Sequence, residues 1–191
     1  QMMSQHGFLD ICRIPELAAE ATMIPIDAFG VDAVILFSDI LTTVVPMGME
    51  MTWDDHKGPG FTNPIRTAED VARLSVPDAE DALSFVMQAA DICKRELVGK
   101  VPNMGFAGAP FTVAMYMVEG GPSARFHQAR KMMFEAPEVF EALVAKVAEM
   151  TTGYVLGQVR HGVDAIIMFD SLAKMVSKEE YDRFALPYAK K

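Results

Sequence analysis

The sequence predicts an α/β protein with a parallel sheet, and three features of the chain support that fold class. Short apolar runs stand at 31–37, 101–106 and 163–169, each bounded by glycine or polar residues. Continuous apolar runs of this length are typical of strands buried on both faces, as in a parallel sheet covered by helices. Helical patterns separate the runs, and one helix-to-strand segment is repeated. Either a β/α barrel or a doubly wound sheet fits these observations.

Helix-start and helix-stop residues divide the rest of the chain. A proline in the first turn and a glycine past the end bound the pattern over 15–29. Ser177 with Glu180 forms a capping box for the last helix, and Thr67 with Asp70 makes a similar start. The predicted helices cover 15–29, 67–74, 77 to about 97, 137–161 and a last segment that begins after 177.

One segment of the chain occurs twice, because residues 29–39 are echoed by residues 161–171. Both copies contain a helix end, a glycine, a buried strand, and then small polar and acidic residues. Ligands bind at the carboxyl ends of parallel strands in both candidate folds, so the repeat places 38–39 and 170–171 where a site would form. The alternative is a chance similarity between two buried strands.

The segment 48–63 interrupts the regular pattern. A turn near its middle follows Trp53 and contains two glycines between short extended arms. The segment is either a hairpin or an irregular surface loop, and the pattern alone favours the loop.

Charge and composition exclude several classes of protein. The 191 residues include 26 acidic and 17 basic side chains, and the formal charge of −9 argues against general binding to nucleic acid or to an anionic membrane surface. No apolar run approaches the ~20 residues of a membrane-spanning helix. Cys12 and Cys93 cannot build a disulfide framework, and the spacing of the four histidines supports no metal site.

Asp39, Tyr116 and Ser171 are the side chains best suited to chemistry or binding. Asp39 either accepts N–H hydrogen bonds and stabilises positive charge at a strand end, or caps the next turn. Tyr116 either presents its hydroxyl to a cleft or packs in the core with that hydroxyl satisfied. Ser171 is a candidate hydrogen-bonding group rather than a nucleophile, since no histidine is arranged with it.

The glycine-rich segment 104–112 follows a predicted strand. Gly105 and Gly108 would let the backbone approach a ligand, with Phe106 and Phe111 as apolar faces. The alternative is a tight strand-to-helix turn. The segment matches neither a P-loop nor the dinucleotide-binding fingerprint.

Four segments carry a family resemblance. They are the early helical segment 8–20, the acidic segment 35–41, the glycine-rich segment 105–121 and the segment 169–171. On these segments the chain resembles the uroporphyrinogen decarboxylase family over nearly its whole length. The third segment is the most specific, because it is similar to the family's longest signature nearly residue for residue.

The resemblance implies a (β/α)8 TIM barrel that is incomplete in this chain, which would be a single partial domain over 1–191 comprising about half of the barrel. It also implies a carboxy-lyase that uses no cofactor and no metal. That enzyme decarboxylates the four acetate side chains of uroporphyrinogen III to methyl groups, giving coproporphyrinogen III in tetrapyrrole (heme or chlorophyll) biosynthesis.

The resemblance also implies roles for residues at matching positions. Asp39 is implied as the catalytic residue at the barrel centre, where it binds pyrrole N–H groups and stabilises the protonated intermediate. The implied substrate-binding residues are Phe8, Asp39, Tyr116 and Ser171, with Phe106 and Gly108 as cleft lining.

Partners and compartment follow from the same resemblance. The implied partner is the anionic tetrapyrrole uroporphyrinogen, with no nucleic acid and no membrane, and the full-length enzyme is expected to be a homodimer. The enzyme resembled is cytoplasmic in bacteria and animals and located in plastids in plants and algae.

Parts of the family pattern are missing from the chain. The family's opening segment, whose arginines meet the substrate carboxylates, is absent, as is the later part of the barrel. The segment 42–48 is shortened, and Lys174 stands where glycine is usual. We therefore expect an internal fragment that lacks activity by itself.

Two other functions stay open. Related barrels transfer methyl groups from corrinoid proteins to thiols, using zinc held by histidine and cysteine late in the chain. A truncated barrel that serves as a non-catalytic binding or assembly partner is the other alternative.

Overall fold

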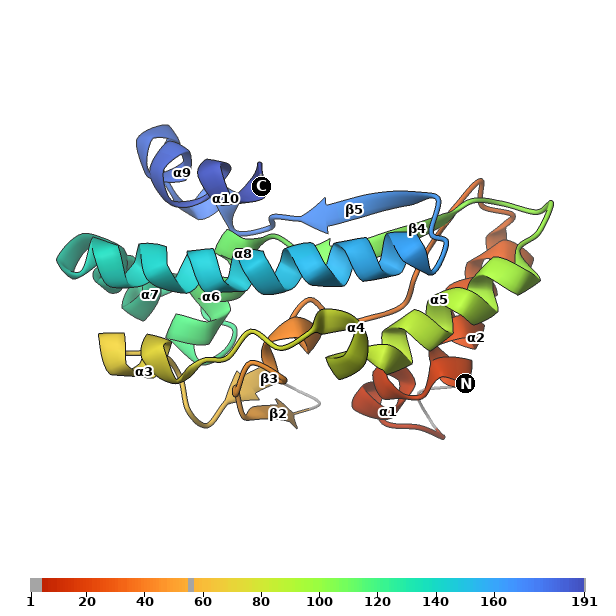
Figure 1. Ribbon diagram of the computed structural model, residues 1–191, viewed down its shortest axis with the longest axis horizontal. Helices are drawn as coiled ribbons and strands as arrows, with labels where there is room; N and C mark the ends of the chain where they lie inside the picture. Colours follow the sequence, from red (N-terminus) through yellow and green to blue (C-terminus); the bar gives the residue numbers. More distant parts are fainter. Residues whose placement is uncertain (1–4, 55–56, 191) are drawn as a thin grey trace. The chain divides into compact units, whose positions relative to one another are not determined.

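The computed structural model describes residues 5–54 and 57–190, which form helices, a parallel sheet and a separate hairpin (Figure 1). These residues fall into two compact units. The first unit contains the described part of 1–42 with 78–107 and 153–168, and the second contains the described parts of 43–77, 108–152 and 169–191. No helix among the described residues is long and apolar enough to cross a membrane.

The parallel sheet contains three strands in the order β1 (Val34–Ile35), β4 (Asn103–Gly108) and β5 (Ala165–Phe169). β1 pairs with β4 in parallel, with Val34 opposite Asn103. β5 runs in the same direction, since hydrogen bonds join Asp164 to Asn103 near its start and Ala109 to Phe169 at its end. The three predicted strands are therefore confirmed, although each begins two or three residues later than predicted.

The helices of the first unit begin with α1 (Phe8–Arg13) and α2 (Pro15–Phe29). α2 has the predicted bounds because Pro15 fits the first helical turn and Gly30 adopts a left-handed φ of 62° after the last. The predicted single helix from 77 to 97 is wrong, since it is divided into α4 (Ala79–Ala82) and α5 (Ser84–Glu96). Leu83 between them is buried and leaves the helical conformation, with φ −120° and ψ 31°.

The long helix α8 (Pro137–Arg160) confirms the prediction for 137–161, and its last part packs against β4 in the first unit. Gln158, fully buried on α8, accepts a hydrogen bond from the Phe106 N–H (2.8 Å) and donates one to the Phe106 carbonyl (3.0 Å). A Cβ on Gly105 would stand 2.8 Å from the Gln158 side-chain oxygen and 2.6 Å from Ile166. Gly105 therefore makes room for this side chain, and its role in the approach to a ligand stays a prediction.

The second unit contains an antiparallel hairpin of β2 (Met51–Asp54) and β3 (Gly58–Phe61). Met51 lies opposite Phe61 and Trp53 opposite Pro59. The loop interpretation of 48–63 is thus wrong and the hairpin alternative is right. Two glycines and a proline in β3 remove the side-chain alternation that normally reveals a strand. Asp55 and His56, in the turn, lie outside the described residues.

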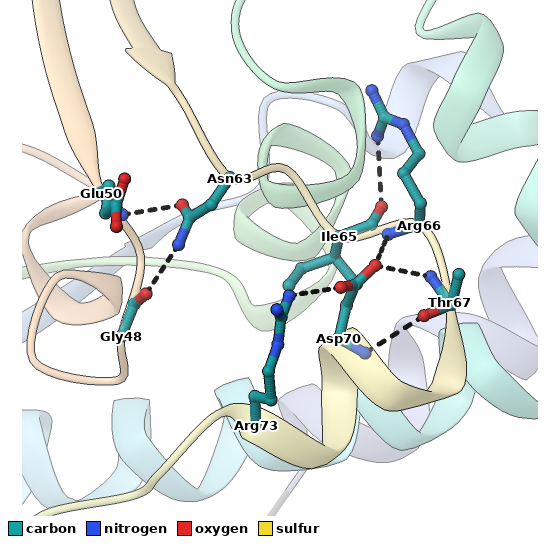
Figure 2. A network of polar contacts seen from close by, with 8 residues as sticks. All are labelled: Gly48, Glu50, Asn63, Ile65, Arg66, Thr67, Asp70 and Arg73. Atoms are coloured by element: carbon teal, nitrogen blue, oxygen red, sulfur yellow. Dashed lines mark hydrogen bonds and ion pairs between the residues drawn. The ribbon is translucent and has the colours of Figure 1, made fainter.

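A polar network fixes the segment after the hairpin (Figure 2). The Asn63 side chain accepts a hydrogen bond from Glu50 N–H (2.8 Å) and donates one to the Gly48 carbonyl (2.9 Å). One amide side chain thereby joins the residues before β2 to those after β3.

Asp70 is the centre of the second half of this network, at the start of α3 (Ala68–Arg73). Its carboxylate accepts hydrogen bonds from Arg66 N–H (2.8 Å) and Thr67 N–H (2.9 Å) and pairs with Arg73. The Thr67 hydroxyl accepts from Asp70 N–H in return, which confirms the predicted capping box. Desolvation opposes ionisation, yet these hydrogen bonds and the Arg73 charge lower the pKa of Asp70.

The remaining elements of the second unit build an aromatic core. Phe111 packs edge-to-face on Phe140 at 6.0 Å between ring centroids, and Phe140 packs in the same way on Phe184 at 5.6 Å. Ser177 and Glu180 form the predicted capping box before the last long helix. Besides the hairpin and α3, the helical elements described in the second unit are η2 (Thr42–Val44), which begins at the last residue of the first unit, α6 (Pro110–Glu119), α7 (His127–Glu135), the first part of α8, η3 (Ala173–Met175), α9 (Lys178–Phe184) and α10 (Leu186–Ala189).

Candidate functional site

The residues that follow β1 are held from two sides within the first unit. Thr22, a buried residue of α2, accepts a hydrogen bond from Phe37 N–H at 2.8 Å. Ser38 Oγ lies 3.4 Å from the hydroxyl of Tyr154, a buried side chain of α8. These contacts set the path of the backbone on which Asp39 stands.

The Asp39 side chain is half-buried and makes few polar contacts with the described residues. Its Oδ1 accepts a hydrogen bond from Leu41 N–H at 2.8 Å, so the side chain also caps its own turn. From residues 5–54 and 57–190, no ion pair and no second hydrogen bond reaches this carboxylate. Burial raises its pKa, which the Leu41 hydrogen bond only partly offsets. Asp39 is therefore a carboxylate whose ionisation would be favoured by a cation or by added N–H donors.

The groups around Asp39 confirm that this region disfavours negative charge. Burial, and then the nearby Asp39 carboxylate, raise the pKa of the Cys12 thiol to about 12. Burial also raises the pKa of Tyr154. Both groups stay neutral at physiological pH, and of the three acidic groups Cys12, Tyr154 and Asp39 only Asp39 can carry charge there. Cys12 and Cys93 are both buried free thiols.

Phe8 lies in the same unit as Asp39. It is the first residue of α1, is half-buried, and packs edge-to-face on Phe37 with ring centroids 5.9 Å apart. The structure thus brings Phe8 against the short segment that ends in Asp39.

Tyr116 and Ser171 lie in the second unit. Tyr116 is half-buried on α6 and packs edge-to-face on Phe126 at 5.2 Å between ring centroids. Ser171 is exposed between a half-buried Asp170 and a buried Leu172. Both side chains are available to solvent in part, as ligand-binding groups must be.

Thr112 makes contacts beside Ser171 that the residue pattern does not predict. Thr112 belongs to the glycine-rich segment, where the residue pattern gave it no role. Its hydroxyl donates to Asp170 Oδ1 at 2.7 Å and accepts from Leu172 N–H at 3.1 Å. Phe111, predicted as a ligand-facing ring, is instead buried in the aromatic core.

The described part of the chain contains no cluster of side chains that could bind a metal ion. Among residues 5–54 and 57–190, no group of three or more His, Cys, Asp or Glu side chains could hold a metal ion. In the first unit the candidate residues are Phe8 and Asp39, and in the second unit they are Tyr116 and Ser171.

Comparison with known proteins gives these residues a family context. The family model described as Uroporphyrinogen decarboxylase (URO-D) matches residues 1–191. The uroporphyrinogen decarboxylase of Trichlorobacter lovleyi is 48% identical over 188 residues, 98% of this chain and 55% of that protein. That of Geotalea daltonii is 47% identical over 191 residues, 100% of this chain and 56% of that protein. The chain thus spans about half the length of the curated relatives it matches.

A solved structure agrees on the fold. A methyltransferase from Methanosarcina mazei superimposes with a TM-score of 0.77 at 22% identity, over 96% of this chain and 55% of that one. At this identity the likeness shows the fold alone. The parallel strands and their helices are accordingly about half of a (β/α)8 barrel.

Proposed function

Because the chain belongs to the uroporphyrinogen decarboxylase family, we propose that the full-length protein decarboxylates the four acetate side chains of uroporphyrinogen III, giving coproporphyrinogen III. This assigns it to tetrapyrrole biosynthesis as a carboxy-lyase that needs no cofactor. Asp39 is the proposed catalytic residue, and Phe8, Tyr116 and Ser171 are proposed to contact substrate.

The observation that carries the proposal is the environment of Asp39. It is a half-buried carboxylate just beyond the carboxyl end of β1, with a raised pKa and no cationic partner among the residues the structure describes. Coulombic attraction strengthens as the local dielectric falls, so such a carboxylate interacts strongly with a positive charge that forms nearby. Pyrrole N–H groups are suitable donors to the same oxygens.

The chemistry needs this kind of group. A proton added to a pyrrole carbon makes the ring cationic, and the ring then accepts the electron pair of the bond between the acetate CH2 and its carboxylate. Carbon dioxide leaves, and a second proton on the exocyclic carbon, with loss of the first, completes the methyl group. Asp39 stabilises the cation without taking part in a covalent step.

The wider properties of the full-length protein form part of the same proposal. We expect a homodimer that acts in the cytoplasm, or in a plastid if the source is a plant or an alga. The substrate carries eight carboxylates while this chain carries a formal charge of −9, so the cationic contacts to those carboxylates are expected outside this segment.

The test is turnover of uroporphyrinogen by the full-length protein and its Asp39→Asn variant. Asn keeps the size of the side chain and an oxygen for Leu41 N–H but loses the charge, so we expect kcat to fall by about 10²- to 10³-fold. Asp32→Asn, at an exposed aspartate before the same strand, is the matched control and should retain activity. Near-normal turnover by Asp39→Asn would remove Asp39 from the mechanism.

Two further outcomes would replace the proposed reaction. Stoichiometric zinc in the full-length protein, together with methyl transfer to a thiol, would indicate the corrinoid-dependent methyltransferase. A stable 191-residue product that associates with a separate complementary half, without any decarboxylation, would indicate the non-catalytic half-barrel.

A further inference from the structure

Thr112 connects two segments of the second unit that are far apart in the sequence. Its side chain is fully buried at the third position of α6. The hydroxyl donates to Asp170 Oδ1 at 2.7 Å and accepts from Leu172 N–H at 3.1 Å. These two partners are the residues immediately before and after Ser171.

Other helical threonines use their hydroxyls differently. The Thr22 and Thr152 hydroxyls donate to the carbonyls four residues earlier, Ala18 and Ala148, both at 2.8 Å. This bond back to the same helix is the usual one for threonine. The Thr112 hydroxyl instead donates to a carboxylate in another segment, which makes it a tertiary contact rather than a helix contact.

The chain around Ser171 is held by the backbone of Phe169 and of Leu172 and by the side chain of Asp170. Ala109 N–H donates to the Phe169 carbonyl at 2.9 Å, next to the two bonds that Thr112 makes with Asp170 and Leu172. Ser171 itself is exposed while Leu172 is buried. The segment is therefore held from the protein side, and the Ser171 side chain is left toward solvent.

We propose that Thr112 is a positioning residue that holds Ser171 in the orientation in which it hydrogen-bonds substrate, an inference that rests on the proposed function. A serine on an unrestrained loop samples several orientations, and only one of them contributes to binding. Apparent affinity falls in proportion to the fraction of competent orientations. The ligand group is a carboxylate or N–H of the anionic tetrapyrrole, since a hydroxyl can bind either.

The test compares Thr112→Val with Thr112→Ser in the full-length protein. Val has the same shape but no hydroxyl, so we expect KM for uroporphyrinogen to rise about tenfold with a smaller change in kcat. Ser keeps the hydroxyl and should restore KM. Thr152→Val removes a hydroxyl that bonds only within its own helix and should leave KM unchanged.

A double-mutant cycle separates positioning from a general structural effect. If Thr112 acts through Ser171, Thr112→Val should add no further rise in KM in a Ser171→Ala background. Additive effects of the two substitutions would overturn the proposal. Amide hydrogen exchange supplies a readout other than activity, since Leu172 N–H should lose protection in Thr112→Val and keep it in Thr112→Ser.

Failure of this inference differs from failure of the proposed function. If the wild type is active and Asp39→Asn is not, while Thr112→Val has normal KM and normal Leu172 exchange, only the positioning role is overturned. If the wild type does not consume uroporphyrinogen, both fall together. If Thr112→Val does not fold, two variants of Asp170 replace it. Asp170→Ala removes the acceptor of the Thr112 hydroxyl and should raise KM, whereas Asp170→Asn keeps an acceptor and should not. Equal KM values for the two variants would contradict the inference.

Discussion

The two copies of the repeated segment contain β1 and β5, and the chain just after each strand is held by a buried threonine of a helix. Thr22 accepts from Phe37 N–H at the end of β1, and Thr112 accepts from Leu172 N–H after β5. The two polar residues that follow each strand occur in opposite order, Ser38 before Asp39 and Asp170 before Ser171.

The order of the acid and the serine determines which of the two contacts a helix hydroxyl. The first of the two is connected to a helix hydroxyl, Ser38 to Tyr154 at 3.4 Å and Asp170 to Thr112 at 2.7 Å. The second residue, Asp39 in one copy and Ser171 in the other, makes no such contact with a helix hydroxyl among the described residues. The acid in the first position, Asp170, is bound by a helix hydroxyl, whereas the acid in the second position, Asp39, accepts only from its own turn among the described residues and is the proposed catalytic group.

The largest expected effect comes from removing the two acidic charges separately. Asp39→Asn should lower kcat by about 10²- to 10³-fold in the full-length protein, whereas Asp170→Asn should lower it less than about tenfold because Asn still accepts from Thr112. Steady-state turnover of uroporphyrinogen measures both. Equal losses would contradict the assignment of different roles to the two acids.

The next effect concerns the threonine at the first strand end. Thr22→Val leaves the Phe37 N–H without its acceptor, so the free energy of unfolding should fall by about 1–3 kcal/mol. Thr22→Ser keeps the acceptor and should recover most of the loss. Urea denaturation of the full-length protein gives the comparison, and a stable Val variant would show that the Thr22 bond adds nothing.

A smaller effect, opposite in sign, is expected for the stability of Asp39→Asn. Because burial raises the pKa of Asp39 in the folded state, folding favours its protonated form. The protonated side chain contributes its full stability at pH values below the pKa of Asp39 in the unfolded chain. That contribution is lost as the pH rises through the pKa of Asp39 in the folded protein. The Asn variant should therefore be more stable than the wild type at pH 7, with a difference that shrinks toward pH 4. A variant less stable at pH 7 would contradict this.

The smallest effects are expected at the glycines that begin the two copies. Gly30 and Gly162 have left-handed φ values of 62° and 84°, so Ala should cost about 1 kcal/mol at each position. At Gly162 the added Cβ would also displace the flexible Lys94 side chain, whereas nothing lies within 4 Å at Gly30. Thermal denaturation of Gly30→Ala and Gly162→Ala measures both losses of stability. A gain in stability in either variant would contradict the cost expected for alanine at a left-handed φ.

Residues next to a helix end predicted the helices whose ends are fixed by those same residues. Pro15 and Gly30 bound α2 as predicted, and the capping boxes at Thr67 and Ser177 are present. The division at Leu83 was not predicted from periodicity, because Leu83 is a buried apolar residue that continues the helical pattern in sequence while its backbone leaves the helical conformation. The hairpin was missed because its second strand has few side chains that could alternate.

The candidate site was only partly predictable for the same reason. Asp39 and Ser171 could be selected because both follow apolar runs that the repeat marks as strands. Thr22, Thr112 and Tyr154 could not, since their partners are 15, 58 and 116 residues away along the chain. A buried hydroxyl in a helix looks the same in sequence whether it bonds within its own helix or to another segment.

The buried amide of Gln158 has a consequence for how the sequence can change. Because it both accepts from and donates to the backbone of Phe106, it acts like a short piece of neighbouring strand, and a carboxylate could supply only the acceptor. The same amide occupies the space that a side chain at 105 would need. Substitution at either position alone therefore meets a barrier, and the two positions are expected to vary together among relatives.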